Sequence, residues 1–378
     1  MSVPRQIPAA LVSEGQRMAS ICNACRYCEG FCAVFPAIER RLSFEEGDLA
    51  YLGNLCHNCG SCYYSCQYAP PHEFKLNLPQ LLADTRIETY RKYAWPNGFA
   101  RLFENNGVVA SLVLISCTVV LLLGLAATLD RSVLAAAHPD SAGSFYAVIS
   151  HQTMASGFGI VFVIVLSAMG VGAVRFWRDT QEQLRDLASL VPFVQSMGDV
   201  LQLKYLGGGG DGCTYPDERP SHLRRWFHHF TFYGFMLCFA ATCVATVYHY
   251  GLGWKAPYPF WSAPVVLGTL GGFGLLIGPV GLLWLKRVRD PALSATKDGG
   301  MDVAFLLLLW LTSASGLALL AWREAAGMAF LLALHLAIVM ALFLTLPYSK
   351  FVHGIYRFAA LLRYHLERKR PLPELGTE

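Results

Sequence analysis

Eight cysteines in two runs near the N-terminus carry the most specific chemistry in this sequence. Each run follows the pattern C-x2-C-x2-C-x3-C, which is the ligand spacing of a 4Fe–4S cluster. In two-cluster ferredoxins, the fourth cysteine of one run binds the other cluster. We therefore predict two clusters, one bound by Cys22, Cys25, Cys28 and Cys66 and the other by Cys56, Cys59, Cys62 and Cys32.

Zinc binding and disulfide formation are the alternatives for these cysteines. Zinc sites usually separate two C-x2-C pairs by a longer loop. The segment Met1–Ser20 lacks the apolar core of a signal peptide, and clustered cysteines without export favour metal binding in a reducing compartment. Ala33 and Gln67 follow the two runs where ferredoxins usually have proline. Because Glu14–Ile21 and Leu81–Tyr93 have helical patterns, we expect a mainly helical dicluster domain.

Four histidines in apolar segments form the second candidate site, because ionisable residues in membrane spans are rare and usually functional. His228 and His353 are expected near the inner ends of two spans, and His249 and His335 near the outer ends. Each pair could bind one iron from both sides, which predicts one or two bis-histidine b-type haems. The alternative for any single histidine is an interfacial anchor or a hydrogen-bonded core residue, and His151 fits that alternative better.

Helical geometry supports these pairs. His335 and His353 are 18 residues apart, or five whole turns, and share one face if the helix continues through Pro347. His228 and His249 are offset by only about 60°, whereas His229 and His249 are offset by about 160°. We therefore favour His228 over His229 as the ligand.

Composition defines the elements that must position these residues. The chain has 378 residues, of which 54% are apolar and only 15% charged, which is too apolar for an ordinary soluble protein of this size. Residues 1–95 are polar and rich in cysteine. The remainder, 96–378, contains six apolar runs long enough to cross a bilayer, near 108–129, 150–174, 228–250, 263–285, 303–322 and 328–347.

Basic residues predict the orientation of the spans. The loop at 175–225, the segment after the fourth span and the C-terminal tail are rich in Lys and Arg, whereas the alternate loops hold only Arg131, Lys255 and Arg323. Positive loops remain in the cytoplasm. We therefore predict an all-α protein of the inner (cytoplasmic) membrane. Its helical dicluster ferredoxin-like domain (1–95) precedes a six-helix transmembrane bundle (96–378), and both termini are cytoplasmic.

Several motifs resemble the tricarballylate/citrate-utilisation protein B family over nearly the whole chain. They are the paired cysteine runs and the segments Cys66–Phe74, Gly212–Pro216, His228–Phe235, Ala256–Pro259, Gly299–Asp302 and Pro347–His353. The last, Pro-x-x-Lys-x-x-His, more distantly resembles the haem-binding subunit of respiratory nitrate reductase. The resemblance implies a protein that reoxidises a soluble flavoprotein, tricarballylate dehydrogenase, and passes electrons to the membrane quinone pool.

The soluble part shows no acid–base or nucleophile constellation and no phosphate-binding fingerprint, so we expect no catalytic residues here and dehydrogenation on the partner. No nucleic-acid partner is expected. Three alternatives stay open. The chain could be a heterodisulfide-reductase-like or other dehydrogenase subunit, or a membrane redox sensor. A transporter is disfavoured, because the spans carry paired histidines and no carboxylate relay.

Overall fold

The computed structural model describes residues 6–130, 137, 143–296 and 299–371, so Arg131 lies outside the described residues. Within these ranges, nearly all regular structure is helical. The exceptions are the two-residue strands β1 (Cys213–Thr214) and β2 (Pro220–Ser221), which pair antiparallel. The predicted all-α fold is confirmed.

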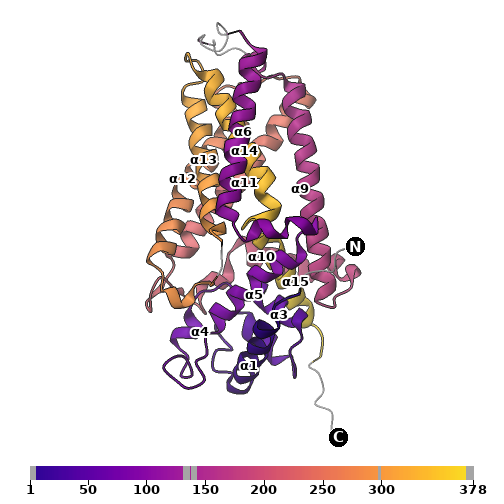
Figure 1. Ribbon diagram of the computed structural model, residues 1–378, viewed down its shortest axis with the longest axis vertical. Coiled ribbons are helices and arrows are strands. Elements are labelled where there is room, and N and C mark those ends of the chain that lie inside the picture. The colour runs from indigo at the N-terminus through magenta and orange to yellow at the C-terminus, as the bar shows by residue number, and fades with distance from the viewer. Residues whose placement is uncertain (1–5, 131–136, 138–142, 297–298, 372–378) are drawn as a thin grey trace.

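Six helices are long and apolar enough to cross a membrane, and they extend along the long axis of the molecule (Figure 1). Each matches a predicted span. The second continues five residues beyond the predicted end and the third begins five residues earlier. The helices are α6 (Asn106–Thr128), α9 (His151–Asp179), α11 (Leu223–Leu252), α12 (Ala263–Val288), α13 (Met301–Ala321) and α14 (Met328–Thr345).

Helices α11 and α12 pack backbone to backbone, because glycines line their contact. A Cβ atom at Gly271 would lie 2.7 Å from the carbonyl oxygen of Gly234, and one at Gly278 would lie 2.6 Å from the backbone nitrogen of Thr231. Small residues at helix contacts allow such close approach where lipid supplies no hydrophobic driving force. The close packing thereby fixes the rotation of helix α11 about its axis, with the face that carries Gly234 against α12.

The cysteine-rich part is built from short helices at one end of the bundle (Figure 1). Both flanks predicted to be helical are confirmed, within α1 and α5. The elements are α1 (Ala9–Cys25), α2 (Val34–Glu39), α3 (Glu46–Leu55), α4 (Ser61–Tyr64), α5 (Leu78–Tyr93) and the 3-10 helix η1 (Asn97–Phe103). At the start of α3, a Cβ atom on Gly47 would lie 2.3 Å from the carbonyl oxygen of Asp179, so this helix abuts the end of α9.

Most of the connecting elements contact the cysteine-rich part. The side chain of Asn58 donates to the carbonyl of Leu293, and the hydroxyl of Tyr64 donates to Asp290, at 2.9 and 2.8 Å. The loop between α9 and α11 folds back on the same end, and α8 lies near the other end. These elements are α8 (Ser144–Val148), η2 (Leu184–Ala188), α10 (Leu190–Leu201), η3 (Lys204–Gly207) and η4 (Pro291–Leu293).

The helix does not continue through Pro347. Helix α14 ends at Thr345, a 3-10 turn η5 covers Leu346–Tyr348, and a separate helix α15 begins at Val352 and ends at Glu367. Proline has no N–H and its ring clashes with the preceding turn. A helix continuous through Pro347 was the condition for His335 and His353 to share one helical face, and that condition is not met. The relative positions of the two histidines are therefore set by how α14 and α15 pack.

The N-terminal helices share one hydrophobic core with α15, which includes Tyr51 and Tyr90 on one side and Tyr356 and Leu361 on the other. A buried charge network crosses this contact. Arg41 and Arg363 both pair with Glu367, and Asp48 pairs with the same two arginines at 2.7 and 3.3 Å. Helix α15 is thus part of the cysteine-rich unit.

Candidate cofactor-binding sites

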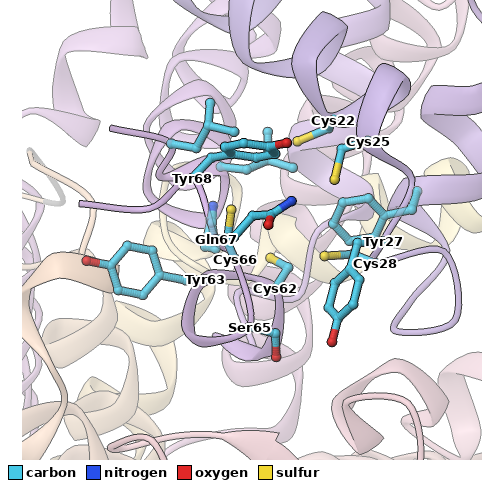
Figure 2. A pocket seen from close by; sticks show the side chains of 14 residues that line it. Cys22, Cys25, Tyr27, Cys28, Cys62, Tyr63, Ser65, Cys66, Gln67 and Tyr68 are labelled. Atoms are coloured by element: carbon cyan, nitrogen blue, oxygen red, sulfur yellow. The ribbon is translucent and has the colours of Figure 1, made fainter. Parts of the chain in front are cut away.

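The first predicted set of thiols surrounds one cavity (Figure 2). Cys22, Cys25, Cys28 and Cys66 line a space of about 260 Å³, together with Cys62. Helix α1 supplies the first two, and Arg26 ends it in a left-handed conformation with φ of 55°, which turns the chain so that Cys28 faces the same space. Cys66 comes from the segment that follows α4.

The second predicted set lines a separate, narrower cavity of about 20 Å³. Its walls include Cys32, Cys56, Cys59 and Cys62. Cys62 borders both cavities, so the two spaces adjoin. The fourth cysteine of each run therefore lies with the first three of the other run, which is the crossed arrangement that the spacing predicts. The binding of a cluster to each set stays a prediction.

Burial and mutual repulsion disfavour several of these thiolates in the metal-free protein. Burial, then the neighbours Cys28, Cys66 and Cys25, raise the pKa of Cys22 to about 12. In the second set, burial followed by Cys59 and Cys56 raises the pKa of Cys32. Because the neighbours named are members of the same predicted set, the electrostatics reproduce the grouping. Cationic iron relieves this cost of ionising the thiols, because it binds the thiolate form.

Cys59 is the exception, and Cys213 explains it. The Cys213 thiol lies in the same buried cluster as Cys59, and its interaction with Cys59 lowers the pKa of Cys59 to about 6. Cys213 is the first residue of β1 and fully buried, and its thiol donates to the carbonyl oxygen of Leu206 at 3.1 Å. The sequence predicts only a structural role for Cys213. Its contact with a candidate ligand depends on the glycine-rich loop of residues 207–212 folding against the segment that carries Cys59. The glycines predict a close backbone approach to a neighbour such as the cysteine-rich domain, but not which residues meet.

Three arginines from three different helices hold the loop that carries Cys56. Arg86 of α5 and Arg357 of α15 both donate to the carbonyl oxygen of Cys56, at 2.6 and 2.8 Å. Arg224 of α11 donates to the carbonyl of Asn58 at 2.6 Å. We call these three side chains the arginine clamp. The sequence alone does not indicate this role, because arginines near a membrane surface ordinarily indicate only the topology of the spans.

The arginine clamp is a local excess of positive charge. Within the described part of the chain, none of its members pairs with a carboxylate, and burial together with Arg86 lowers the pKa of Arg357 to about 9. Buried or half-buried cations that have only carbonyl partners are costly, so the site favours an anionic group. A 4Fe–4S cluster with four thiolate ligands carries net negative charge, and the residues present therefore fit such a group.

His228 and His353 face each other. Their ring centroids lie 6.1 Å apart with an angle of 70° between the ring planes. Metal–imidazole bonds of about 2.0–2.1 Å, with about 1.1 Å more from each nitrogen to its ring centre, put two imidazoles on opposite sides of one metal about 6.3 Å apart. This separation is compatible with His228 and His353 together holding one haem iron, and the haem itself stays a prediction. His229 instead stacks on Tyr233, at 5.6 Å and 14°.

His353 also has the support expected of a ligand. Its Nδ1 lies 2.5 Å from the carbonyl oxygen of Lys350, so an Nδ1–H can donate there and leave Nε2 for a metal. Lys350 itself is fixed by Asp302, whose carboxylate pairs with Lys350 at 2.9 Å and Lys286 at 3.1 Å. The Pro-x-x-Lys-x-x-His motif thus has a structural purpose, since its lysine orients the turn that presents the histidine.

The other predicted histidines lie in different surroundings. His335 is half-buried against α13, with its Nδ1 2.9 Å from the hydroxyl of Ser315. His249 stacks on His151, with ring centroids 3.6 Å apart, and Tyr146 lies at the edge of its ring. The structure therefore brings His249 to His151, and the predicted partnership of His249 with His335 stays a prediction without a contact to support it.

No group of three His, Cys, Asp or Glu side chains in the described residues is arranged to hold a single metal ion. A tetrahedral zinc ion with Zn–S bonds of about 2.3 Å draws its sulfurs to within about 4 Å of one another. The thiols of the first set instead line a cavity of about 260 Å³, which has room for a group larger than a single ion. The cysteine-rich fold and the six spans together define a class, the membrane-associated iron–sulfur electron-transfer proteins.

Comparison with known proteins supports this class. The family model described as citrate utilization protein B matches residues 106–374, and the citrate utilization protein B Fer4-like domain matches residues 15–92. A protein of Escherichia coli named "Citrate utilization protein B" is 51% identical over 359 residues, which are 95% of this chain and 93% of that protein. No solved structure matches. The chain belongs to the citrate utilization protein B family.

Proposed function

We propose that this protein is the membrane electron-transfer component that reoxidises a soluble flavoprotein dehydrogenase and reduces the membrane quinone pool. The family name supports a role in citrate or tricarballylate utilisation, and the resemblance described above supports a tricarballylate dehydrogenase as the partner. When bound, two 4Fe–4S clusters and one or two b-type haems would supply one-electron carriers between a two-electron donor and a two-electron acceptor.

One observation carries the proposal. The two crossed sets of cysteines adjoin at Cys62, and the loop of the second set is bonded to helices that carry the His228–His353 pair. Arg224 precedes His228 by one helical turn, and Arg357 follows His353 by one turn. The candidate cluster site and the candidate haem site therefore share the same short helical segments, as a continuous relay requires.

The exposure of the cysteines supports a direction for this relay. Cys25 of the first set is exposed, and Tyr27 beside it is 69% exposed, whereas Cys56 and Cys59 of the second set are buried. Electrons from a soluble partner would enter at the exposed first set and leave from the second set toward the spans. The distribution of basic loops supports a cytoplasmic location for the cysteine-rich part, in the inner membrane.

The test is to purify the protein without oxygen and to quantify iron, acid-labile sulfide and haem per chain. We expect about eight iron atoms in clusters and a bis-histidine haem spectrum. The chemically reduced protein should then reduce a soluble quinone analogue, and the reduced flavoprotein should reduce the clusters. A colourless preparation would overturn the proposal, and a coloured one that never reduces the quinone analogue would favour a redox sensor.

A further inference from the structure

Helix α10 and the 3-10 turn η2 before it expose an apolar face that no part of the described chain covers. Eight large apolar side chains in this segment are between 36% and 73% exposed, although it belongs to none of the six spans. A patch of this kind marks an interaction surface, because water would disfavour it. The residues are Leu184, Leu187, Leu190, Val191, Phe193, Val194, Met197 and Leu201.

The opposite face of α10 is already occupied. Pro192, Ser196 and Asp199 are buried, and Asp199 accepts a hydrogen bond of 2.8 Å from Nε2 of His365 on α15. At the border between the two faces, the ring of Phe193 is 38% exposed and also meets that of Phe358 on α15 edge-on at 5.3 Å. Helix α10 is therefore firmly attached to α15, and its free face is a built feature of the fold.

The contacts of α10 with the first turns of α11 place its exposed apolar face where the spans would enter the membrane. The hydroxyl of Tyr233 donates to the carbonyl of Leu201 at 2.8 Å, and Arg225 donates to the carbonyl of Gln202 at 2.7 Å. Both donors lie in the first three turns of the span α11. Trp226 on the same turns is 61% exposed, as expected for an aromatic side chain at the lipid–water boundary. Figure 1 shows α10 where the spans meet the N-terminal helices.

Exposed cations flank the apolar face. Arg178 and Arg185 precede α10, and Lys204 follows it. An amphipathic helix with apolar residues on one side and basic residues at its edges is the composition that binds in the plane of a bilayer with anionic lipids. Continuity with the lipid-facing surface of α11 distinguishes this arrangement from a site for a soluble partner.

We propose that α10 is an in-plane membrane helix whose exposed face lies among the lipids of the leaflet nearest the cysteine-rich part. Because α10 is bonded to α15, and α15 shares a core and a charge network with the cysteine-rich helices, this lipid contact sets the position of that part against the bilayer. The membrane contact of the protein then includes an interfacial helix in addition to the spans.

Site-specific photocrosslinking tests this proposal with little disturbance to the fold. The photoreactive residue p-benzoylphenylalanine is placed at Val194, at Leu42 and at Val120 in three separate full-length variants. Leu42 is a matched control, since it is an apolar residue 70% exposed on the cysteine-rich part. Val120, 68% exposed on the span α6, is the positive control. Each variant is reconstituted in vesicles of phosphatidylethanolamine and radiolabelled phosphatidylglycerol and irradiated.

We expect the Val194 and Val120 variants to acquire lipid label and the Leu42 variant to acquire at least about tenfold less. Label on Val120 without label on Val194 would overturn the proposal. A crosslink from Val194 to a second copy of the chain, with no lipid adduct, would also overturn it and would assign the face to an oligomer. The readout is independent of electron transfer, so the proposed function and this inference fail separately.

Discussion

The imidazole rings of His228 and His353 lie 6.1 Å apart, although the two residues belong to different helices and are separated by three complete spans. Each ring lies one helical turn from an arginine that holds the Cys56–Asn58 loop. This relationship ties the candidate haem site to the second set of thiols. The effect of a single substitution on each cofactor can still be measured separately, by the cluster signals and by the haem spectrum.

Cys59→Ser should remove one cluster and leave the other. Cys59 belongs to the buried second set, so we expect iron and acid-labile sulfide to fall by roughly half, with a strong loss of electron flow from flavin to quinone. Elemental analysis and electron paramagnetic resonance measure both. Cys213→Ser is the matched control, since it removes a thiol in contact with Cys59 that we do not assign as a ligand. Full iron content in Cys59→Ser would contradict the assignment.

His353→Ala should abolish the haem absorbance that depends on the His228 pair while the cluster signals persist. The same change at His335 should remove a second haem signal, if that histidine is a ligand. The visible spectrum of each purified variant gives the answer. His229→Ala is the control for the pair, because its ring stacks on Tyr233 away from His353. Unchanged haem content in His353→Ala would refute the ligand assignment.

Gly316→Ala should move the imidazole ring of His335 while leaving the histidine itself unchanged. A Cβ atom at Gly316 would lie 3.0 Å from Cε1 of the imidazole, so the ring must shift or turn. We expect a shifted or weakened haem spectrum if His335 is a ligand. Gly170→Ala in another span is the control, since a Cβ atom there meets nothing within 4 Å. Identical spectra for the two variants would show that the position of His335 is not critical.

Arg357→Gln should make the cluster at the Cys56 loop harder to reduce. Removal of a nearby positive charge disfavours the added electron by on the order of 1–2 kcal/mol, or roughly 40–90 mV for one electron. A redox titration followed by electron paramagnetic resonance measures the shift. Arg17→Gln is the control, because Arg17 is exposed and pairs with Glu14. A potential unchanged in Arg357→Gln would show that the arginine clamp only positions the loop.

Glu367→Ala should weaken the attachment of α15 to the cysteine-rich helices. It removes the carboxylate shared by Arg41 and Arg363, which keep Asp48 as a partner, and this costs about 1.5–3 kcal/mol of stability. Thermal unfolding and limited proteolysis of the C-terminal helix report the loss. Glu14→Ala removes an exposed pair and should change stability by less than about 1 kcal/mol. Equal melting temperatures for the two variants would contradict the importance of the network.

The sequence alone determined the elements of this protein and the groups of cysteines. Spans depend on local apolar length, and the cysteine spacing is a local pattern, so all six spans, the flanking helices and the crossed thiol sets follow from short stretches of chain. The depth of a residue along its span also follows from the local sequence, and the similar depths of His228 and His353 predicted that they pair. These features can be predicted without knowing which elements contact one another.

Only the tertiary structure decided which distant groups meet. The helix ends before Pro347, so the alignment of His335 with His353, which required a helix continuous through that proline, does not hold. Packing of α9 against its neighbours brings His151, not His335, onto His249. The arginine clamp, the contact of Cys213 with Cys59 and the docking of α15 through Glu367 depend in the same way on residues far apart in the chain. Helical periodicity describes the face of a single helix, whereas a partner across the core is chosen by how all the helices pack.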